Sequence, residues 1–491
     1  MKVRDQISPR LRLATLAAIA VLAPVLLLAA PGPAGATSSR PRPSTPVTPD
    51  WSSYLFATDH AGYNPAAAAI TPANAASLVR VWHWQPANRT QTGQPLGLYS
   101  SPVVYGGRVY VGARTGIFYA LDETTGTVVW QRPFGWIAGT TCGPEGFTST
   151  ATVAPDPTTG NPAVYVAAPD GYLYAMNASD GSTLWRALVG IPSTTVNDYY
   201  NWSSPTVVGG VVYIGIASEC DNPLVPGGVI AVDQATGNVI ATYHSTPPGK
   251  VGASVWGSVL ADDNGQIFTS TGNGPTGTDQ VSIMRLALDP VAGTLTKADF
   301  WTISKAQQAA DSDFGSSPTA FVATLAGVPT EMIGSCNKNG HYYAFRASDI
   351  ASGPVWDTQI GDAYRKGTGQ CDAAAIWDGT RLFAASNSTS IGGVAYKGSI
   401  RELDPATGAV LWATGLPGPI IGSPTLDAGG VIAAGAFSSG PGPFLLDSNT
   451  GALLETLPLS KGKTFAQSIF TNSGLLLATT INLGITAYRA P

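Results

Sequence analysis

Short stretches of apolar and polar residues alternate along the chain with a period of two, and clusters of Gly, Pro, Asn and Asp separate them. This pattern predicts short β-strands joined by tight turns. Residues 101–122 illustrate it, because residues 103–105, 109–112 and 117–121 each have the pattern of a strand. The sequence therefore predicts an all-β fold.

One strand–turn–strand unit recurs along the chain. Residues 119–130, YALDETTGTVVW, combine a strand, a turn of the Asp-x-x-Thr-Gly type and a second strand that ends on an aromatic residue. In such a turn the Asp side chain can accept hydrogen bonds from backbone N–H groups, and the Gly can take the left-handed conformation. Six further copies begin at Tyr174, Ile230, Arg285, Tyr343, Arg401 and Leu445.

An eighth copy is divided between the two ends of the repeat region. Residues 485–490, ITAYRA, match the first half of the unit, and residues 77–82, SLVRVW, match the second half. Only a ring requires its ends to meet, so an open solenoid or a tandem sandwich would leave this division unexplained. We therefore expect residues 51–491 to form an eight-bladed β-propeller of four-stranded antiparallel blades, closed by pairing of the N- and C-terminal strands.

The first 36 residues have the pattern of a signal peptide. Four basic residues precede an apolar stretch over residues 13–30, and Ala34-Gly35-Ala36 provides a small-residue cleavage site. Export to the periplasm, the cell envelope or the medium is therefore expected, with an uncleaved anchor as the alternative because the apolar stretch is just long enough to span a bilayer. No cysteine stands directly after the apolar stretch, so no lipid anchor is expected. Residues 37–50 are rich in Pro, Ser and Thr and indicate a linker.

Composition narrows the range of partners and cofactors. The 491 residues include 57 Gly and 38 Pro but only 12% charged residues, which excludes long amphipathic helices and coiled coils. After residue 36 the chain carries 22 Lys and Arg against 30 Asp and Glu, and this acidic excess disfavours binding to nucleic acid or acidic membranes. No Cys-x-x-Cys-His sequence occurs, so no covalent haem is expected.

Four cysteines, Cys142, Cys220, Cys336 and Cys371, predict two disulfides in an exported chain. Three pairings are possible, and the spacing of the cysteines does not decide between them.

Unusual polar and aromatic residues gather in the loops that leave one face of the predicted ring. These residues are Cys142, Glu219, Trp256, Asn273, Asp311, Asp313 and Lys338. Carboxylate and amide oxygens suit Ca²⁺, an indole offers a stacking surface, and a cation can stabilise developing negative charge. Taken singly, each residue has a plainer explanation as a solvated charge, a turn or packing between blades. Their combination predicts a ligand site at the mouth of the central channel.

These residues resemble those of the pyrroloquinoline quinone (PQQ) dependent alcohol dehydrogenases, which are eight-bladed quinoproteins. The similarity begins with the pattern of Trp51, Tyr54 and Tyr63-Asn64-Pro65 and extends to the DFGSSP segment that starts at Asp313. The chain is closest in size to the polyvinyl alcohol dehydrogenases without haem. The resemblance extends over nearly the whole chain after residue 50.

The resemblance implies roles for individual residues. Glu219, Asn273 and Asp313 would be metal ligands for Ca²⁺, with a lanthanide possible because some relatives use a second Asp at the Asp-x-Asp spacing. The cofactor-binding residues would be Trp256 beneath the quinone, Lys338 at its oxygens, and Cys142, which stands where the family often has two adjacent cysteines. Asp313 is the first choice for the catalytic aspartate and Asp311 the second. Because all four cysteines lie in loops on one face, we expect Cys142 to bond Cys220 and Cys336 to bond Cys371.

The implied function is oxidation of an alcohol or polyol by hydride transfer to PQQ with metal assistance, with electrons passing to a separate acceptor such as a cytochrome or a quinone. A non-catalytic propeller that acts as a scaffold or binding module of the cell envelope is the main alternative. A hydrolase or lyase acting on sugars, with Asp311, Asp313 and Glu219 as acid and base, is another. The sequence leaves the substrate open.

Overall fold

The computed structural model describes residues 50–86, 97–137, 145–190, 199–221, 223–365, 370–459 and 462–491. All of them belong to one structural unit, Thr48–Pro491, and Met1–Val47 is a separate unit. The predicted signal peptide, nearly all of the predicted linker and Cys142 lie outside the described residues. Within the described part of the chain, no helix is long and apolar enough to cross a membrane.

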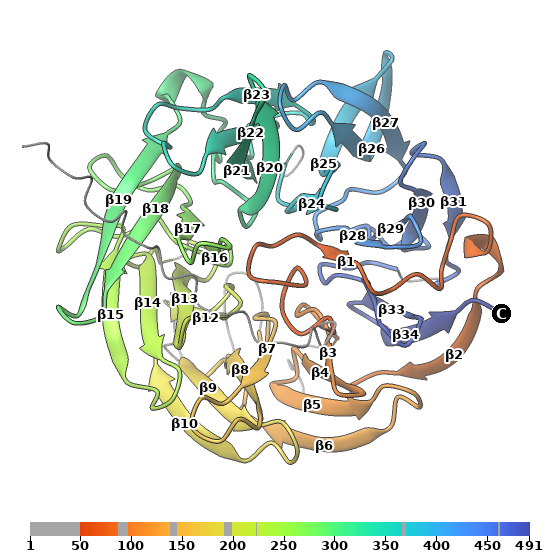
Figure 1. Cartoon of the computed structure of the whole chain (residues 1–491), viewed down its shortest axis with the longest axis horizontal. Helices are drawn as coiled ribbons and strands as arrows, with labels where there is room; N and C mark the ends of the chain where they lie inside the picture. The colour runs from red at the N-terminus through yellow and green to blue at the C-terminus, as the bar shows by residue number, and fades with distance from the viewer. Residues whose placement is uncertain are drawn as a thin grey trace, which may run out of the picture. The chain divides into compact units, whose positions relative to one another are not determined.

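The described residues form eight sheets that follow one another around a ring, which confirms the predicted eight-bladed β-propeller (Figure 1). The first blade contains β3 (Val103–Tyr105), β4 (Arg108–Gly112), β5 (Ile117–Asp122) and β6 (Val128–Pro133). The second contains β7 (Thr152–Pro155), β8 (Pro162–Ala167), β9 (Tyr172–Asn177) and β10 (Thr183–Leu188). The third contains β12 (Thr206–Val208), β13 (Val211–Ser218), β14 (Gly228–Asp233) and β15 (Val239–His244), with β11 (Tyr199–Tyr200) added on β13.

The next four blades have the same antiparallel order. The fourth contains β16 (Leu260–Ala261), β17 (Ile267–Ser270), β18 (Ser282–Asp289) and β19 (Thr294–Thr302). The fifth contains β20 (Thr319–Leu325), β21 (Val328–Cys336), β22 (His341–Arg346) and β23 (Trp356–Gln359). The sixth contains β24 (Ile376–Trp377), β25 (Leu382–Ile391), β26 (Val394–Leu403) and β27 (Val410–Leu416). The seventh contains β28 (Thr425–Asp427), β29 (Val431–Ala434), β30 (Phe444–Asp447) and β31 (Leu453–Thr456), with β1 (Tyr63–Asn64) parallel to β28.

The eighth blade joins the two ends of the repeat region. It contains β32 (Ile469–Phe470), β33 (Leu475–Thr480) and β34 (Gly484–Arg489) from the end of the chain, and β2 (Val79–Trp84) from near its start. β2 pairs antiparallel with β34, with Trp82 opposite Ala487. In Figure 1 the orange β2 accordingly lies beside the blue β34. This pairing is the predicted closure of the ring. Two short 3₁₀ helices, η1 (Ala75–Ser77) and η2 (Lys305–Gln307), lie in connecting segments.

The repeated turn also joins neighbouring blades. Oδ1 of Asp122 accepts the N–H groups of Thr124 and Thr125 at 3.0 and 2.9 Å, and Gly126 has a φ of 69°. A Cβ on Gly126 would lie only 2.6 Å from the ring of Trp82 in the preceding blade, whose Nε1 donates to the carbonyl of Glu123. The turn therefore requires Gly both for its backbone and for the docking of the Trp. The repeat pattern thus encodes packing between blades.

Residues 51–64 form a feature that the sequence did not predict, which we call the N-terminal plug. Its carbonyl groups accept hydrogen bonds from the backbone N–H groups of six blades, through Val104, Val153, Ala261, Ala320, Trp377 and Leu426. The plug follows the first strands of the blades, where they face the channel, and it satisfies polar groups that would otherwise have no partner. Trp51 and Leu55 are fully buried in it. The plug is therefore an integral part of the ring.

Candidate functional site

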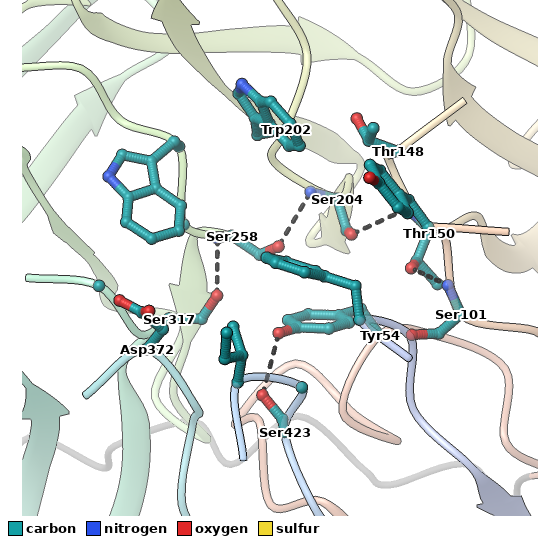
Figure 2. A pocket seen from close by; sticks show the side chains of 17 residues that line it. Tyr54, Ser101, Thr148, Thr150, Trp202, Ser204, Ser258, Ser317, Asp372 and Ser423 are labelled. Carbon is teal, nitrogen blue, oxygen red and sulfur yellow. Dashed lines mark hydrogen bonds between the residues drawn. The ribbon is translucent and has the colours of Figure 1, made fainter. Parts of the chain in front are cut away.

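Two adjoining cavities lie among the inner loops of the propeller. The larger, of about 440 Å³, is called the site cavity and is lined by Trp202, Asp221, Trp256, Asn273, Asp311, Asp313 and Lys338, among others. The smaller, of about 70 Å³, is called the axial chamber (Figure 2). Both are lined by Trp202, Trp256 and Phe465, so these aromatic side chains lie where the two cavities meet.

Four polar residues form one hydrogen-bonded cluster in the wall of the site cavity. Nζ of Lys338, which follows β21, lies 2.6 Å from Oδ2 of Asp313 and 2.9 Å from Oδ2 of Asp311. Asn273 belongs to the preceding blade, and its side-chain amide donates to Oδ1 of Asp311 at 3.1 Å. The backbone N–H of Asn273 donates to Oδ1 of Asp313. Loops of two blades thus bring these sequence-predicted residues together.

Trp256 lies beside this cluster. Nζ of Lys338 is 5.3 Å from the centroid of its ring, which is within the range of a cation–π interaction. Gly272 allows the close approach, because a Cβ at this position would lie 2.8 Å from Oδ1 of Asp313 and 3.4 Å from Nε1 of Trp256. A larger residue at position 272 would therefore push the carboxylate or the indole away.

The charged side chains of the cluster shift one another's pKa values. Burial disfavours the ammonium of Lys338, but the carboxylates of Asp313, Asp372 and Asp311 outweigh it and raise the pKa of Lys338 above its ordinary value. Burial, and next the negative charge of Asp313, raise the pKa of Asp311, although Lys338 opposes the shift. The site thus holds a firmly charged ammonium among a larger number of carboxylates.

Of the two remaining predicted site residues, Glu219 does not line the site cavity and Cys142 lies outside the described residues. Glu219 is fully buried and is not among the residues that line the site cavity. Burial, then the charges of Glu145 and Glu219, raise the pKa of Tyr200, so Glu219 lies within electrostatic range of that phenol. Two residues further along the same loop, Asp221 lines the cavity and its Oδ1 accepts a hydrogen bond from Ser218 Oγ at 2.8 Å. Cys142 lies outside the described residues, and so does its predicted bond to Cys220.

The predicted disulfide between Cys336 and Cys371 is confirmed, with the Cα atoms 5.3 Å apart. It introduces a residue that the sequence analysis missed, because Cys371 directly precedes Asp372. Asp372 lines the axial chamber, and its buried Oδ1 has no hydrogen-bond partner among the described residues. Burial raises the pKa of Asp372 to about 6, while the charge of Lys338 acts against this shift.

A belt of hydroxyl groups surrounds the axial chamber, and Figure 2 labels its members. The hydroxyl belt comprises Ser101, Thr150, Ser204, Ser258, Ser317 and Ser423. Backbone N–H groups donate from one blade to the hydroxyl of the next, as from Ser204 to Ser258 at 2.9 Å and from Ser258 to Ser317 at 2.8 Å. The sequence signal for this belt is a Ser or Thr just before the first strand of most blades.

The belt changes in the sixth blade. Ala374 donates its backbone N–H to Ser423 Oγ at 2.9 Å, but it has no hydroxyl of its own to accept a bond. Asp372, two residues earlier, is the polar side chain that this blade contributes to the chamber. From the plug, Tyr54 also lines the chamber, and its OH lies 3.3 Å from Ser423 Oγ.

The described residues form an eight-bladed β-propeller, and part of the chain is similar to proteins with PQQ-like repeats. Residues 68–287 match a family model of PQQ-like repeats that is described as outer membrane protein assembly factor BamB. Outer membrane protein assembly factor BamB of Legionella pneumophila (strain Paris) is 26% identical over 191 residues, which cover 36% of this chain and 49% of that protein. The chain therefore matches about half the length of this curated relative.

Solved structures of dehydrogenases share the fold. Quinohemoprotein alcohol dehydrogenase from Comamonas testosteroni superposes with a TM-score of 0.68 at 18% identity, covering 90% of this chain and 80% of that one. A europium-containing methanol dehydrogenase superposes with a TM-score of 0.67 at 17% identity, covering 88% of both chains. At these identities the likeness shows the fold alone. It agrees with the predicted β-propeller fold and gives no evidence on the chemistry of the site.

Proposed function

We propose that this chain is an extracytoplasmic quinoprotein dehydrogenase that binds PQQ in the site cavity and oxidises an alcohol. The cluster of Asn273, Asp311, Asp313 and Lys338 beside Trp256 carries the proposal. A propeller that serves only as a scaffold needs its repeats for packing, but it does not need a lysine surrounded by carboxylates next to an open cavity.

The cavity suits a planar, oxygen-rich group. Its volume of about 440 Å³ falls within the range of about 300–1,000 Å³ that is usual for small-molecule sites. Trp256 offers an aromatic face for stacking. Lys338, the only cation among the described residues that line the cavity, can face the oxygens of the group. When bound, PQQ would supply the carbonyl carbon that accepts a hydride from the alcohol.

The geometry favours Asp311 as the base, ahead of Asp313, which was the first choice from the sequence. The side chain of Asp311 is 27% exposed and that of Asp313 only 9%. Both carboxylates are bonded to Lys338 and to Asn273, so it is the greater exposure of Asp311 that distinguishes it. The raised pKa of Asp311 makes its carboxylate a better acceptor for the hydroxyl proton of the alcohol. In this proposal Asp313 keeps Lys338 and Asn273 in place.

The oxygen atoms of the cluster are of the kind that bind a metal ion, but in this structure both carboxylates are bonded to Lys338. The carboxylates of Asp311 and Asp313 and the amide oxygen of Asn273 are hard ligands that suit Ca²⁺ or a lanthanide, which would act as a Lewis acid. However, the described residues contain no group of three or more His, Cys, Asp or Glu side chains that could hold a metal ion. Lys338 is bonded to both aspartates. A metal held by Asp311 and Asp313 would therefore compete with the ammonium of Lys338.

The proposed location is outside the cytoplasm, as the predicted signal peptide and the predicted disulfides indicate. The sequence contains no haem-attachment motif, so electrons would leave to a separate acceptor. The substrate is proposed only as an alcohol or polyol.

Dye-linked alcohol oxidation tests this function. Residues 37–491 would be produced, incubated with PQQ and with Ca²⁺ or La³⁺ in turn, and supplied with a panel of primary and secondary alcohols and an artificial electron acceptor. Turnover that requires PQQ is expected, and it should be lost in Lys338→Met and kept in Lys305→Met, which changes an exposed lysine away from the cavity. A folded protein with no PQQ-dependent turnover on any alcohol would count against the proposal.

The second candidate is a non-catalytic role in the cell envelope. The match to BamB over 36% of the chain is the observation in its favour. This role predicts a folded protein that does not bind PQQ and whose cavity residues can be replaced without effect on its binding to a partner. Equilibrium titration with PQQ separates the two candidates, because only the dehydrogenase should bind the cofactor.

A further inference from the structure

The loop that leads from the fifth blade toward the sixth reaches the site cavity. We call residues 360–365 the Tyr364 loop, because its Tyr364 lines the cavity. The backbone N–H of Tyr364 donates to the carbonyl of Lys338 at 2.8 Å. Trp256 comes from the connection between the third and fourth blades. Tyr364 therefore contributes an aromatic surface to the cavity from another part of the ring.

Three donors converge on the carbonyl of Ile360 at the start of this loop. Ser386 Oγ donates to it at 2.7 Å, Thr389 Oγ1 donates at 3.1 Å, and Nη1 of Arg401 donates to it as well. All three residues belong to the long hairpin of β25 and β26 in the sixth blade. The start of the Tyr364 loop is therefore anchored on the neighbouring blade.

The loop is also bonded through its backbone N–H groups. Those of Ile360 and Gly361 donate to the carbonyl of Gly340 at 2.9 and 3.0 Å, and that of Asp362 donates to the carbonyl of Ser388 at 2.7 Å. Ser388 Oγ in turn donates to Oδ2 of Asp362 at 2.8 Å. Contacts with both blades thus fix the path of the chain up to Tyr364.

Arg401 is an unusual residue for its place in the repeat. At the equivalent place, the repeats of the first, second and fifth blades have a tyrosine, which is Tyr119, Tyr174 or Tyr343. Arg401 is only 5% exposed, and its hydrogen-bond partners among the described residues are one carbonyl and three hydroxyl groups, with no carboxylate. Burial of a guanidinium without a carboxylate partner is costly. Its bond to the Ile360 carbonyl, which anchors the Tyr364 loop, gives this burial a reason.

We propose that Tyr364 is a substrate-contacting residue of the site and that Arg401 is the positioning residue that fixes it. The ring of Tyr364 offers an apolar surface to the carbon skeleton of the alcohol. Arg401 acts at a distance, by holding the Ile360 carbonyl and with it the loop. The role of Tyr364 rests on the proposed function, whereas the role of Arg401 is a property of the ligand-free protein.

Hydrogen exchange of the ligand-free protein, read by mass spectrometry, tests the positioning role without any turnover. The peptides of interest contain residues 360–364, where four backbone N–H groups are hydrogen-bonded. In Arg401→Gln we expect this segment to exchange at least tenfold faster, because the loop opens locally when its anchor is lost, while peptides of the other blades keep their rates. Arg401→Lys retains a charged donor and should restore much of the protection.

A second variant keeps the test decisive if Arg401→Gln does not fold. The Ser386→Ala/Thr389→Val protein removes the other two donors to the Ile360 carbonyl and should also speed exchange of this segment. Arg108→Gln is the matched control, because it removes bonds of the same kind, at 2.9 and 2.8 Å, to two carbonyls of the second blade away from the site cavity. Exchange of residues 360–364 should not change in this control.

Steady-state kinetics of the PQQ-loaded protein test the substrate contact. In Tyr364→Ala we expect KM for the alcohol that the wild type oxidises fastest to rise about fivefold or more, with a much smaller change in kcat. Arg401→Gln should raise KM in the same direction, and Arg401→Lys should return it toward the wild-type value.

Wild-type exchange of residues 360–364 in a folded Arg401→Gln protein, or in the double variant if Arg401→Gln does not fold, would overturn the positioning role. A wild-type KM in a folded Tyr364→Ala protein would overturn the substrate contact. Failure of the proposed function would look different, since the wild type would then show no PQQ-dependent turnover although exchange of the loop still responds to Arg401. That result would remove the substrate role of Tyr364 and leave the positioning role of Arg401.

Discussion

Lys338 and Asp313 are linked twice, since Nζ of Lys338 lies 2.6 Å from Oδ2 of Asp313 and the backbone N–H of Lys338 lies 2.9 Å from the carbonyl of Asp313. The loop before β20 and the loop after β21 are therefore fixed to each other at both backbone and side chain. Asn273 joins this pair from the neighbouring blade. The site is thus supported by rigid strands on two blades, which favours a preorganised geometry.

Gly272→Ala tests the packing between Asp313 and Trp256. The added Cβ would lie 2.8 Å from Oδ1 of Asp313, so the carboxylate must move or the protein must lose stability, by about 1–3 kcal/mol. We expect PQQ-dependent turnover to fall at least tenfold, measured beside chemical denaturation. Gly440→Ala, whose Cβ would have no neighbour closer than 3.8 Å, serves as the control. Wild-type turnover and stability in Gly272→Ala would show that the fit is loose.

The two aspartates should differ when they are changed separately. If Asp311 accepts the proton, Asp311→Asn should reduce kcat by about 10²–10⁴-fold with little change in PQQ affinity. Asp313→Asn should weaken the hold on Lys338 and Asn273, and therefore change PQQ affinity as well as kcat. Steady-state kinetics together with cofactor titration separate these effects. A large loss of kcat only in Asp313→Asn would return the role of base to that residue.

Removal of the N-terminal plug should destabilise the whole ring. A chain that starts at residue 65 loses the backbone hydrogen bonds to six blades and the buried side chains of Trp51 and Leu55. Each of these side chains contributes about 1.5–3 kcal/mol by burial, and each hydrogen bond about 0.5–1.5 kcal/mol. We expect a clearly lower Tm by calorimetry. A chain that starts at residue 48 is the control, and equal Tm values for the two chains would contradict the structural role of the plug.

Acid should weaken the plug through His60. Its ring is buried, Nδ1 lies 2.8 Å from the carbonyl of Pro318, and burial lowers the pKa of His60 to about 4. The unfolded chain binds this proton near pH 6.5, so the contribution of His60 to stability is full above that pH and is lost as the pH falls toward 4. The loss amounts to about 3 kcal/mol.

Chemical denaturation of the wild type and of His60→Gln between pH 7.5 and 4 measures this effect. The variant should lack the part of the acid destabilisation that comes from His60, so the two stability curves should converge as the pH falls. Parallel curves over this range would show that His60 does not carry the pH dependence.

The fold was predictable because the repeats encode contacts that are local or lie between adjacent blades. Asp122 and Gly126 define a turn, and Trp82 docks on the next copy of that turn, so the sequence alone indicates a ring with a divided last blade. The convergence of Asn273, Asp311 and Lys338 was predictable for the same reason, since each follows or precedes a strand at an equivalent place.

The missed residues depend on packing across the channel, for which the repeats carry no signal. Asp372 is recognisable as a residue that lines the axial chamber only when the Cys336–Cys371 disulfide and the contact with Gly315 are known. Asp221, rather than Glu219, lines the cavity, and between them the chain turns through left-handed backbone conformations at Cys220 and Asp221, with φ values of 53° and 56°. The plug precedes the repeats, and its contacts lie on strands far away in the sequence.

Equilibrium titration of the folded protein with PQQ tests the proposed cofactor site most directly. The quenching of tryptophan fluorescence and the absorbance of the bound quinone would be followed for residues 37–491, for Trp256→Ala and for Lys338→Met. We expect saturable binding of one PQQ at micromolar concentration or below, weakened at least tenfold in both variants. Absence of binding at micromolar PQQ, or equal binding by all three folded proteins, would contradict it.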